Sequence, residues 1–192
     1  MTTTIKKSIL TLFKVSLLVT LFVGVSCTSE SVSDFDSTNK NTNEKERKER
    51  PMKGNFSNTA DLSVEPLICE PGVLDIPITT NHLFGNVTHL GKLQDGSLGS
   101  PQTCELFDEA AFTLRITYNT FYIAPNGDEL YGVSETFVTP APPNFTSGIF
   151  TGSVTIIGGT GRFAEATGGW DFVNVSYDGP NSVWQIDGSI IY

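Results

Sequence analysis

His82 and His89 are the only histidines in the chain, and histidine is the side chain whose charge changes most readily near neutral pH. They are therefore the first candidates for acid–base catalysis or metal binding. Seven positions apart on a regular strand, the two side chains would face opposite sides of a sheet, although a bulge at Gly85 would restore a common face. We expect no shared metal site, and we keep His89 as a candidate ligand contact.

Two arginines, Arg115 and Arg162, stand in an acidic part of the chain. From Asp61 onward these two and Lys92 are the only cations against 15 acidic residues. An ion pair is the first expectation for each arginine, and Arg115 at a cavity mouth would instead bind a carboxylate head group. The net negative charge of this region repels phosphate backbones, which argues against nucleic-acid binding. No set of nucleophile, base and orienting group is recognisable.

Aromatic side chains are frequent in the second half of the chain. Exposed aromatic rings stack on sugars, but filling a core is their more frequent use at alternating strand positions. Tyr118 and Trp184 fall on apolar strand faces, so we expect them either to line a cavity or to fill it. The other aromatic residues weighed for this role are Tyr122, Tyr131, Trp170, Phe172 and Tyr177.

The cysteines divide into one near the N-terminus and a pair. Cys69 and Cys104 would form a disulfide in an oxidising compartment, and closing that loop would stabilise the fold by about 3 to 4 kcal/mol. Two buried free thiols are the alternative. No Cys-x-x-Cys spacing of a zinc site is present.

The N-terminus predicts export. Lys6 and Lys7 precede an apolar run over 15–25, which has the length of a signal peptide and is too short to span a bilayer. The sequence Gly-Val-Ser-Cys ending at Cys27 resembles the lipobox of bacterial lipoproteins, although Leu is usual where Gly24 stands. That resemblance implies a lipidated Cys27 and a membrane anchor.

The region after this anchor is polar. Residues 28–60 are rich in Ser, Thr, Asn and charged side chains, and they lack the apolar residues that would offset ordering. We therefore expect a signal peptide over 1–26, a disordered tether over 27–62 and a folded domain over 63–192.

The domain reads as a series of strands with a period of two. Leu114, Ile116 and Tyr118 alternate with polar residues, and Trp184 and Ile186 do the same near the C-terminus. The predicted strands begin near Val73, His82, Cys104, Ala111, Leu130, Gly148, Trp170 and Val183. Eight antiparallel strands favour an all-β closed barrel, with a β-sandwich as the alternative.

A glycine-framed turn over 158–169 separates two of these strands. Its Gly-x-Gly-x-x-Ala pattern is a loose dinucleotide fingerprint, but the few residues before Gly168 leave no room for the crossover helix of a nucleotide site. The run Gly-Gly-Thr-Gly-Arg-Phe-Ala-x-Ala-Thr-Gly resembles the signature turn of allene oxide cyclase-like and dirigent-like barrels, which are calycin-like. The residues that carry the resemblance are Gly158, Gly159, Thr160, Gly161, Arg162, Phe163 and Gly168.

This resemblance implies an eight-stranded barrel with a cavity, and Phe163 as the plug of one end. Segments 86–92 and 126–132 resemble secreted bacterial members. The functional expectation is a non-catalytic binding or interaction module for an apolar small molecule, carried by an outer-membrane lipoprotein of the cell envelope whose domain is a candidate for display at the cell surface. An allene oxide cyclase-like isomerase and a glycan- or protein-binding surface are the alternatives. We expect no cofactor and no metal.

Overall fold

Apolar residues at every second position build a set of antiparallel strands in the computed structural model, which describes residues 47–70, 72–142, 147–178 and 181–192. The elements run in the order β1 (Glu49–Asp61), β2 (Leu67–Cys69), β3 (Ile76–Ile78), β4 (Thr80–Val87), β5 (Gly91–Lys92), β6 (Leu98–Asp108), β7 (Thr113–Ile123), β8 (Glu129–Pro140), β9 (Ser147–Gly159), the 3-10 helix η1 (Gly161–Phe163), β10 (Thr167–Asp178) and β11 (Asn181–Ile191). No helix of these residues is long and apolar enough to cross a membrane.

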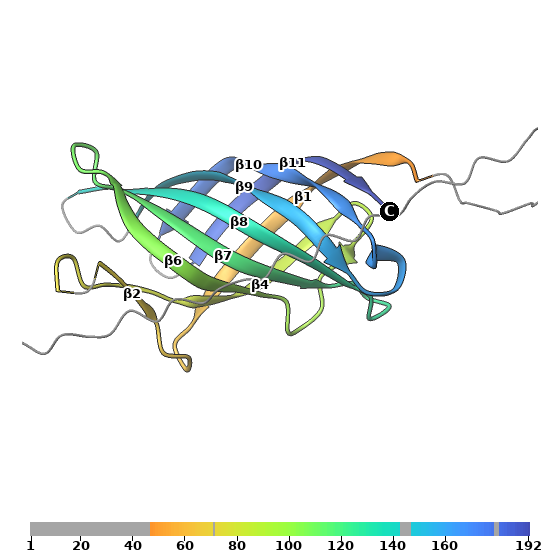
Figure 1. Ribbon diagram of the computed structural model, residues 1–192, viewed down its shortest axis with the longest axis horizontal. Helices are drawn as coiled ribbons and strands as arrows, with labels where there is room; N and C mark the ends of the chain where they lie inside the picture. The colour runs from red at the N-terminus through yellow and green to blue at the C-terminus, as the bar shows by residue number, and fades with distance from the viewer. Residues whose placement is uncertain (1–46, 71, 143–146, 179–180) are drawn as a thin grey trace, which may run out of the picture. The chain divides into compact units, whose positions relative to one another are not determined.

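Eight of the strands close into a barrel. The order around the sheet is β1-β11-β10-β9-β8-β7-β6-β4, and β1 also pairs with β4, which completes the ring. Each pairing is antiparallel, and β5 adds two residues beside β4. Figure 1 shows β6, β7 and β8 side by side on the near wall, with β1 crossing behind them. The predicted eight-stranded antiparallel barrel is thus confirmed.

The first barrel strand lies where the sequence predicted tether. The predicted boundary at 62/63 is wrong because β1 covers Glu49–Asp61 and pairs with both β11 and β4. Met52 and Phe56 are fully buried, and Gly54 lies between them where the strands approach closely. Glu49 and Lys53, which alternate with these residues, are exposed. The signal peptide and residues 27–46 of the predicted tether, with Cys27, lie outside the described residues.

The strand predicted near Val73 is not a barrel strand. Val73 is 74% exposed in a turn whose amide bonds to Glu70, and the flanking residues form the separate two-stranded sheet of β2 and β3. Phe112, also expected on a strand, lies in the turn before β7 with a φ of 52°. Both predictions were wrong for the same reason. An apolar residue beside a tight turn gives the same local sequence pattern as the first residue of a strand.

A hairpin at Asn126-Gly127 joins β7 to β8. Gly127 has a φ of 83°, and its amide donates to the Ala124 carbonyl at 2.9 Å. A bulge at Asn174, with a φ of 51°, shifts the register of β10. Because of that extra residue, Phe172 rather than Val173 packs against the core before the bulge. Val175 packs against the core after the bulge, so the side chains do not alternate uniformly along β10.

The turn after β9 closes one end of the barrel. Gly158 and Gly161 have φ values of 128° and 53°, which glycine adopts without steric cost. Thr160 ties the turn to β8, because its hydroxyl accepts from the Glu129 amide at 2.9 Å and its own amide donates to the Glu129 carbonyl at 2.8 Å. Phe163 is fully buried and packs edge-on against Tyr192 at 5.2 Å. The interior is therefore filled at this end.

Candidate functional site

The other end of the barrel contains a cavity of about 310 Å³. Along β8 the two ends are easily told apart: Leu130 pairs with Gly159 beside the closing turn, and Pro140 pairs with Gly148 at the far end. Pro140 lines the cavity. The cavity therefore lies away from the glycine turn that carries the family resemblance.

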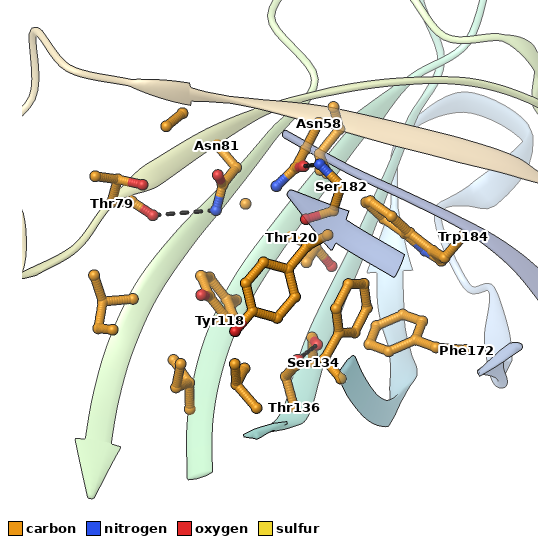
Figure 2. Close-up of a pocket in the computed structure, with 18 of the residues that line it drawn as sticks. Asn58, Thr79, Asn81, Tyr118, Thr120, Ser134, Thr136, Phe172, Ser182 and Trp184 are labelled. Atoms are coloured by element: carbon orange, nitrogen blue, oxygen red, sulfur yellow. Dashed lines mark hydrogen bonds between the residues drawn. The ribbon is translucent and has the colours of Figure 1, made fainter. Parts of the chain in front are cut away.

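Strand β7 supplies the longest stretch of cavity wall. Its inward positions from Leu114 to Tyr122 line the cavity in succession, as the alternation of side chains in a strand requires. The facing wall comes from β8, β9, β10 and β11, with Val154, Phe172 and Trp184 among its members. Both walls combine apolar side chains with hydroxyls and amides, and Figure 2 shows the polar groups converging on the hollow.

A third wall is the short sheet of β2 and β3. Strand β4 pairs with β6 only at Asn81 and His82, although β6 continues to Asp108. The segment from Leu67 to Thr79, which we call the strap, contacts β6 beyond the point where β4 leaves it. Ile76, Pro77, Ile78 and Thr79 of the strap line the cavity.

The predicted disulfide fixes this strap. Cys69 of β2 and Cys104 of β6 are bonded, with their Cα atoms 5.0 Å apart, so the prediction is confirmed. Cys69 and Ile78 pack with Leu114 and Ile116 in a small apolar cluster separate from the main core. Covalent linkage and this cluster together hold the strap over the gap between β4 and β6.

Several polar groups of the cavity wall are hydrogen-bonded to one another. The Asn81 side-chain amide donates to the Thr79 carbonyl at 3.1 Å, and the Ser182 amide donates to Asn58 Oδ1 at 2.8 Å (Figure 2). The hydroxyls of Ser134 and Thr136 lie 2.9 Å apart and share a hydrogen bond.

Two buried polar atoms of the wall have no hydrogen-bond partner among the described residues: Thr120 Oγ1 and Trp184 Nε1. Burial of the two tyrosines nearest Thr120 raises the pKa of Tyr118 and of Tyr122 well above the usual range. At Tyr122 the neighbouring Thr120 hydroxyl opposes part of that shift. Both phenols are therefore neutral at physiological pH.

The described wall is uncharged. The residues that line the cavity include no Asp, Glu, His, Lys, Arg or Cys. Side chains that transfer a proton readily near pH 7 are thus missing from this part of the lining. What the wall offers to a molecule is apolar contact and neutral hydrogen bonding.

Of the candidate ligand contacts, Tyr118 and Trp184 line this cavity, whereas His89 and Arg115 do not. Arg115 bonds to Glu135 and Glu105 on the outer face of the sheet, with Nε 2.6 Å from Glu135 Oε1. Those two carboxylates raise its pKa and occupy its guanidinium. The expected ion pair of Arg115 is thus confirmed, and Arg115 does not line the cavity, where it would have bound a carboxylate.

His89 belongs to the closed end of the barrel. Its φ is 69°, its Nδ1 lies 3.3 Å from the Tyr192 hydroxyl, and its carbonyl accepts from Arg162 Nη2 at 2.9 Å. His82 instead lies 3.1 Å from an Asp61 carboxylate oxygen. The two histidines are therefore apart, and no group of three or more His, Cys, Asp or Glu side chains within the described ranges is arranged to hold a metal.

Most of the aromatic side chains considered for sugar stacking lie inside the barrel. Phe56 stacks on Trp184 with ring centroids 5.4 Å apart, and Tyr122 packs edge-on against Trp170. Sequence reasoning missed the polar wall formed by Thr120, Ser134 and Thr136. Their inward parity on β7 and β8 was a usable signal, because hydroxyl groups at core-facing positions are unusual.

Comparison of the sequence with protein-family profiles and with curated proteins finds no match. Among solved structures, a pterocarpan synthase dirigent protein is similar, with 14% sequence identity and a TM-score of 0.41. The match covers 76% of this chain and 86% of that protein. Similarity at this level does not carry function from one protein to the other.

Proposed function

We propose that the barrel is a non-catalytic binding module that takes a small, largely apolar molecule into the cavity lined by Tyr118 and Trp184. The observation that carries this proposal is the cavity itself. Its volume of about 310 Å³ lies at the lower end of the range of roughly 300 to 1,000 Å³ that is usual for small-molecule sites. A barrel whose side chains filled the interior throughout would have no such space.

The uncharged wall favours binding over an isomerase or cyclase. A reaction that moves protons would need a group that changes its protonation near neutral pH, and the described lining supplies only hydroxyls, amides and an indole. An outward-facing glycan site has less support, because Trp170, Trp184 and Tyr122 are buried in the core.

We further propose that the barrel is tethered to the outer membrane as a lipoprotein through Cys27. Cys27 precedes the start of β1 at Glu49 by 22 residues, a length that reaches at most about 75 Å when fully extended. The Cys27→Ala variant is expected to accumulate as unprocessed precursor. Normal maturation and membrane retention of that variant would remove the anchor from the proposal.

The binding proposal is tested by filling the cavity. Gly99 lines it, and a Cβ at this position would meet only Leu83 and Tyr118, at 3.9 to 4.0 Å. Gly99→Phe therefore projects a ring into the hollow with little backbone strain. Val133→Phe adds the same ring at an exposed position of β8 and is the matched control.

The full-length chain and both variants are purified under mild conditions, and bound organic molecules are extracted and identified by mass spectrometry. We expect the same small molecule from the natural protein and from Val133→Phe, and none from Gly99→Phe. Equal recovery from the Gly99→Phe protein would place the molecule outside the cavity. An empty natural protein that also fails to bind small apolar probes would refute the proposal.

A further inference from the structure

The outer face of the barrel over β4, β1, β11 and β10 contains a row of side-chain amides. Asn55 of β1 lies opposite Asn86 of β4 on one side and opposite Gln185 of β11 on the other. Asn174 of β10 continues the row, because its Nδ2 donates to Gln185 Oε1 at 2.5 Å. All four side chains are exposed and line an open hollow of that face. Figure 1 shows β10, β11 and β1, three of these strands, side by side.

These amides lie where the backbone disfavours them. Asn is depleted in strands, yet Asn55 and Asn86 both lie in regular strand pairings. Asn174 adopts a φ of 51° in the bulge of β10, and bulges re-aim side chains and are frequent beside functional sites. Departures from local sequence rules are expected where function requires them. The coincidence of the amide row with the bulge therefore points to a function of this face.

A second row, next to the amides, supplies apolar contact. Ser57 of β1 lies opposite Phe84 of β4 and Val183 of β11, which are 44% and 54% exposed. Neighbouring strands are about 4.8 Å apart, so Phe84 and Val183 stand about 10 Å apart with only the small Ser57 between them. Ser57 and Val183 line the same hollow as the amides. One molecule can thus touch apolar and hydrogen-bonding groups together.

Neither row carries a charge, although the domain is strongly acidic. Lys53 and Asp187, two positions along β1 and β11 from the amide row, form an ion pair with each other at 3.2 Å. In the described part of the chain, the side-chain amides of Asn55 and Asn86 have no hydrogen-bond partner. A side-chain amide both donates and accepts. The face therefore presents unused donors and acceptors without a net charge.

From this arrangement we infer that the hollow binds a neutral carbohydrate. Adjacent hydroxyls of a sugar each donate and accept, as an amide does, so Asn55 and Asn86 each bond a pair of them. The C–H face of the sugar ring lies against Phe84. A protein partner fits less well, because interface cores are enriched in aromatic, Met and Arg side chains, and these two rows contain a single ring. Burial of the tryptophans argues against a site built on them, and this site is built on amides instead.

Titration with five hexasaccharides tests the inference. Cellohexaose, xylohexaose, mannohexaose and laminarihexaose are neutral, and the galacturonate hexamer is the charged probe. The side-chain amide signals of the isotope-labelled full-length chain are followed by nuclear magnetic resonance at millimolar sugar concentrations. We expect at least one neutral sugar to move the signals of Asn55 and Asn86. The signal of Asn119, an exposed amide on the outer face of β7, should stay unchanged.

Strand-compatible variants separate binding from folding. Asn55→Thr and Asn86→Thr replace an amide by a residue favoured in strands, so the urea midpoint should hold or rise. Each variant should nevertheless bind the sugar about 2- to 10-fold more weakly, because hydrogen bonds to the ligand are lost. Asn119→Thr is the matched control and should leave the affinity unchanged. Gly99→Phe, which fills the cavity, should also bind the sugar normally.

Several results would overturn the inference. They are the failure of every neutral sugar to bind, tightest binding of the galacturonate hexamer, and full affinity in both Asn55→Thr and Asn86→Thr. Loss of sugar binding in Gly99→Phe would place the sugar in the cavity and would overturn it as well. The outer site does not depend on an apolar molecule in the cavity, so either proposal can fail without the other.

Discussion

Breaking the disulfide between Cys69 and Cys104 is expected to lower the free energy of unfolding and to loosen the strap. The bond closes a loop across a sequence separation of 35 residues. In the chain-entropy account, a loop of that length restricts the unfolded chain by about 4 kcal/mol. The strap itself has little independent stability, because β2 and β3 share only three residue pairs and isolated hairpins are marginal in water.

Urea unfolding of the oxidised protein and of the Cys69→Ala/Cys104→Ala variant measures the first effect, with an expected loss of about 3 to 4 kcal/mol. Hydrogen exchange of the strap amides measures the second, and these should exchange faster in the variant while β7 and β8 stay protected. Addition of a reductant to the variant is the control and should change neither result.

A loss below about 1 kcal/mol would contradict the entropic account. Unchanged exchange over the strap would show instead that packing among Ile78, Leu114 and Ile116 suffices to hold it. Because four strap residues line the cavity, faster exchange there should also be accompanied by weaker binding of small apolar probes.

Three further predictions concern the barrel itself. Phe163→Ala should cost about 3 to 5 kcal/mol in urea unfolding because the fully buried plug is lost; a loss as small as that of Phe163→Leu would mean that the end collapses readily. Gly54→Ala should cost about 1 to 3 kcal/mol, since its Cβ would lie 2.6 Å from the Asn86 carbonyl oxygen. Gly99→Ala, which has open space, is the control and should be neutral or stabilising by up to about 1 kcal/mol. Burial raises the pKa of Tyr118 and Tyr122, so their contribution to stability is complete below about pH 10 and is lost as the pH rises beyond it. Phenolate absorbance should therefore show these two ionising only with alkaline unfolding, and early ionisation in the folded protein would contradict the burial argument.

Strand periodicity predicted the architecture because most barrel strands bury one face and expose the other. β7 and β11 were found in this way, and their inward residues, such as Ile116 and Ile186, are buried. β1 was missed because its outward face is charged and its inward face includes a glycine, so composition over the whole segment concealed Met52 and Phe56. Its pairing with β11 joins parts of the chain too distant for a local pattern to reveal.

The candidate site was predicted in part. Parity identified Tyr118 and Trp184 as interior residues, but the sequence could not show whether interior side chains fill the barrel or leave a hollow. Whether a hollow remains depends on the summed volume of inward side chains from eight strands. A short stretch of sequence does not contain that information. Because cations are few in the domain, Arg115 was considered as a ligand contact. In the structure it forms ion pairs with Glu105 and Glu135 on the outer face of the sheet.

The closure of the ring between β1 and β11 has a consequence for the order of folding. Arg50 Nη1 donates to the Tyr192 hydroxyl across 142 positions of the chain, and the whole length of β11 pairs with β1. Contacts between such distant residues form late and slow the folding of β proteins. Until the C-terminal strand is available, β1 and β10 each present an unpaired edge on which another chain could add a strand. Ring closure is thus the step at which this barrel passes from an aggregation-prone open sheet to a protected fold.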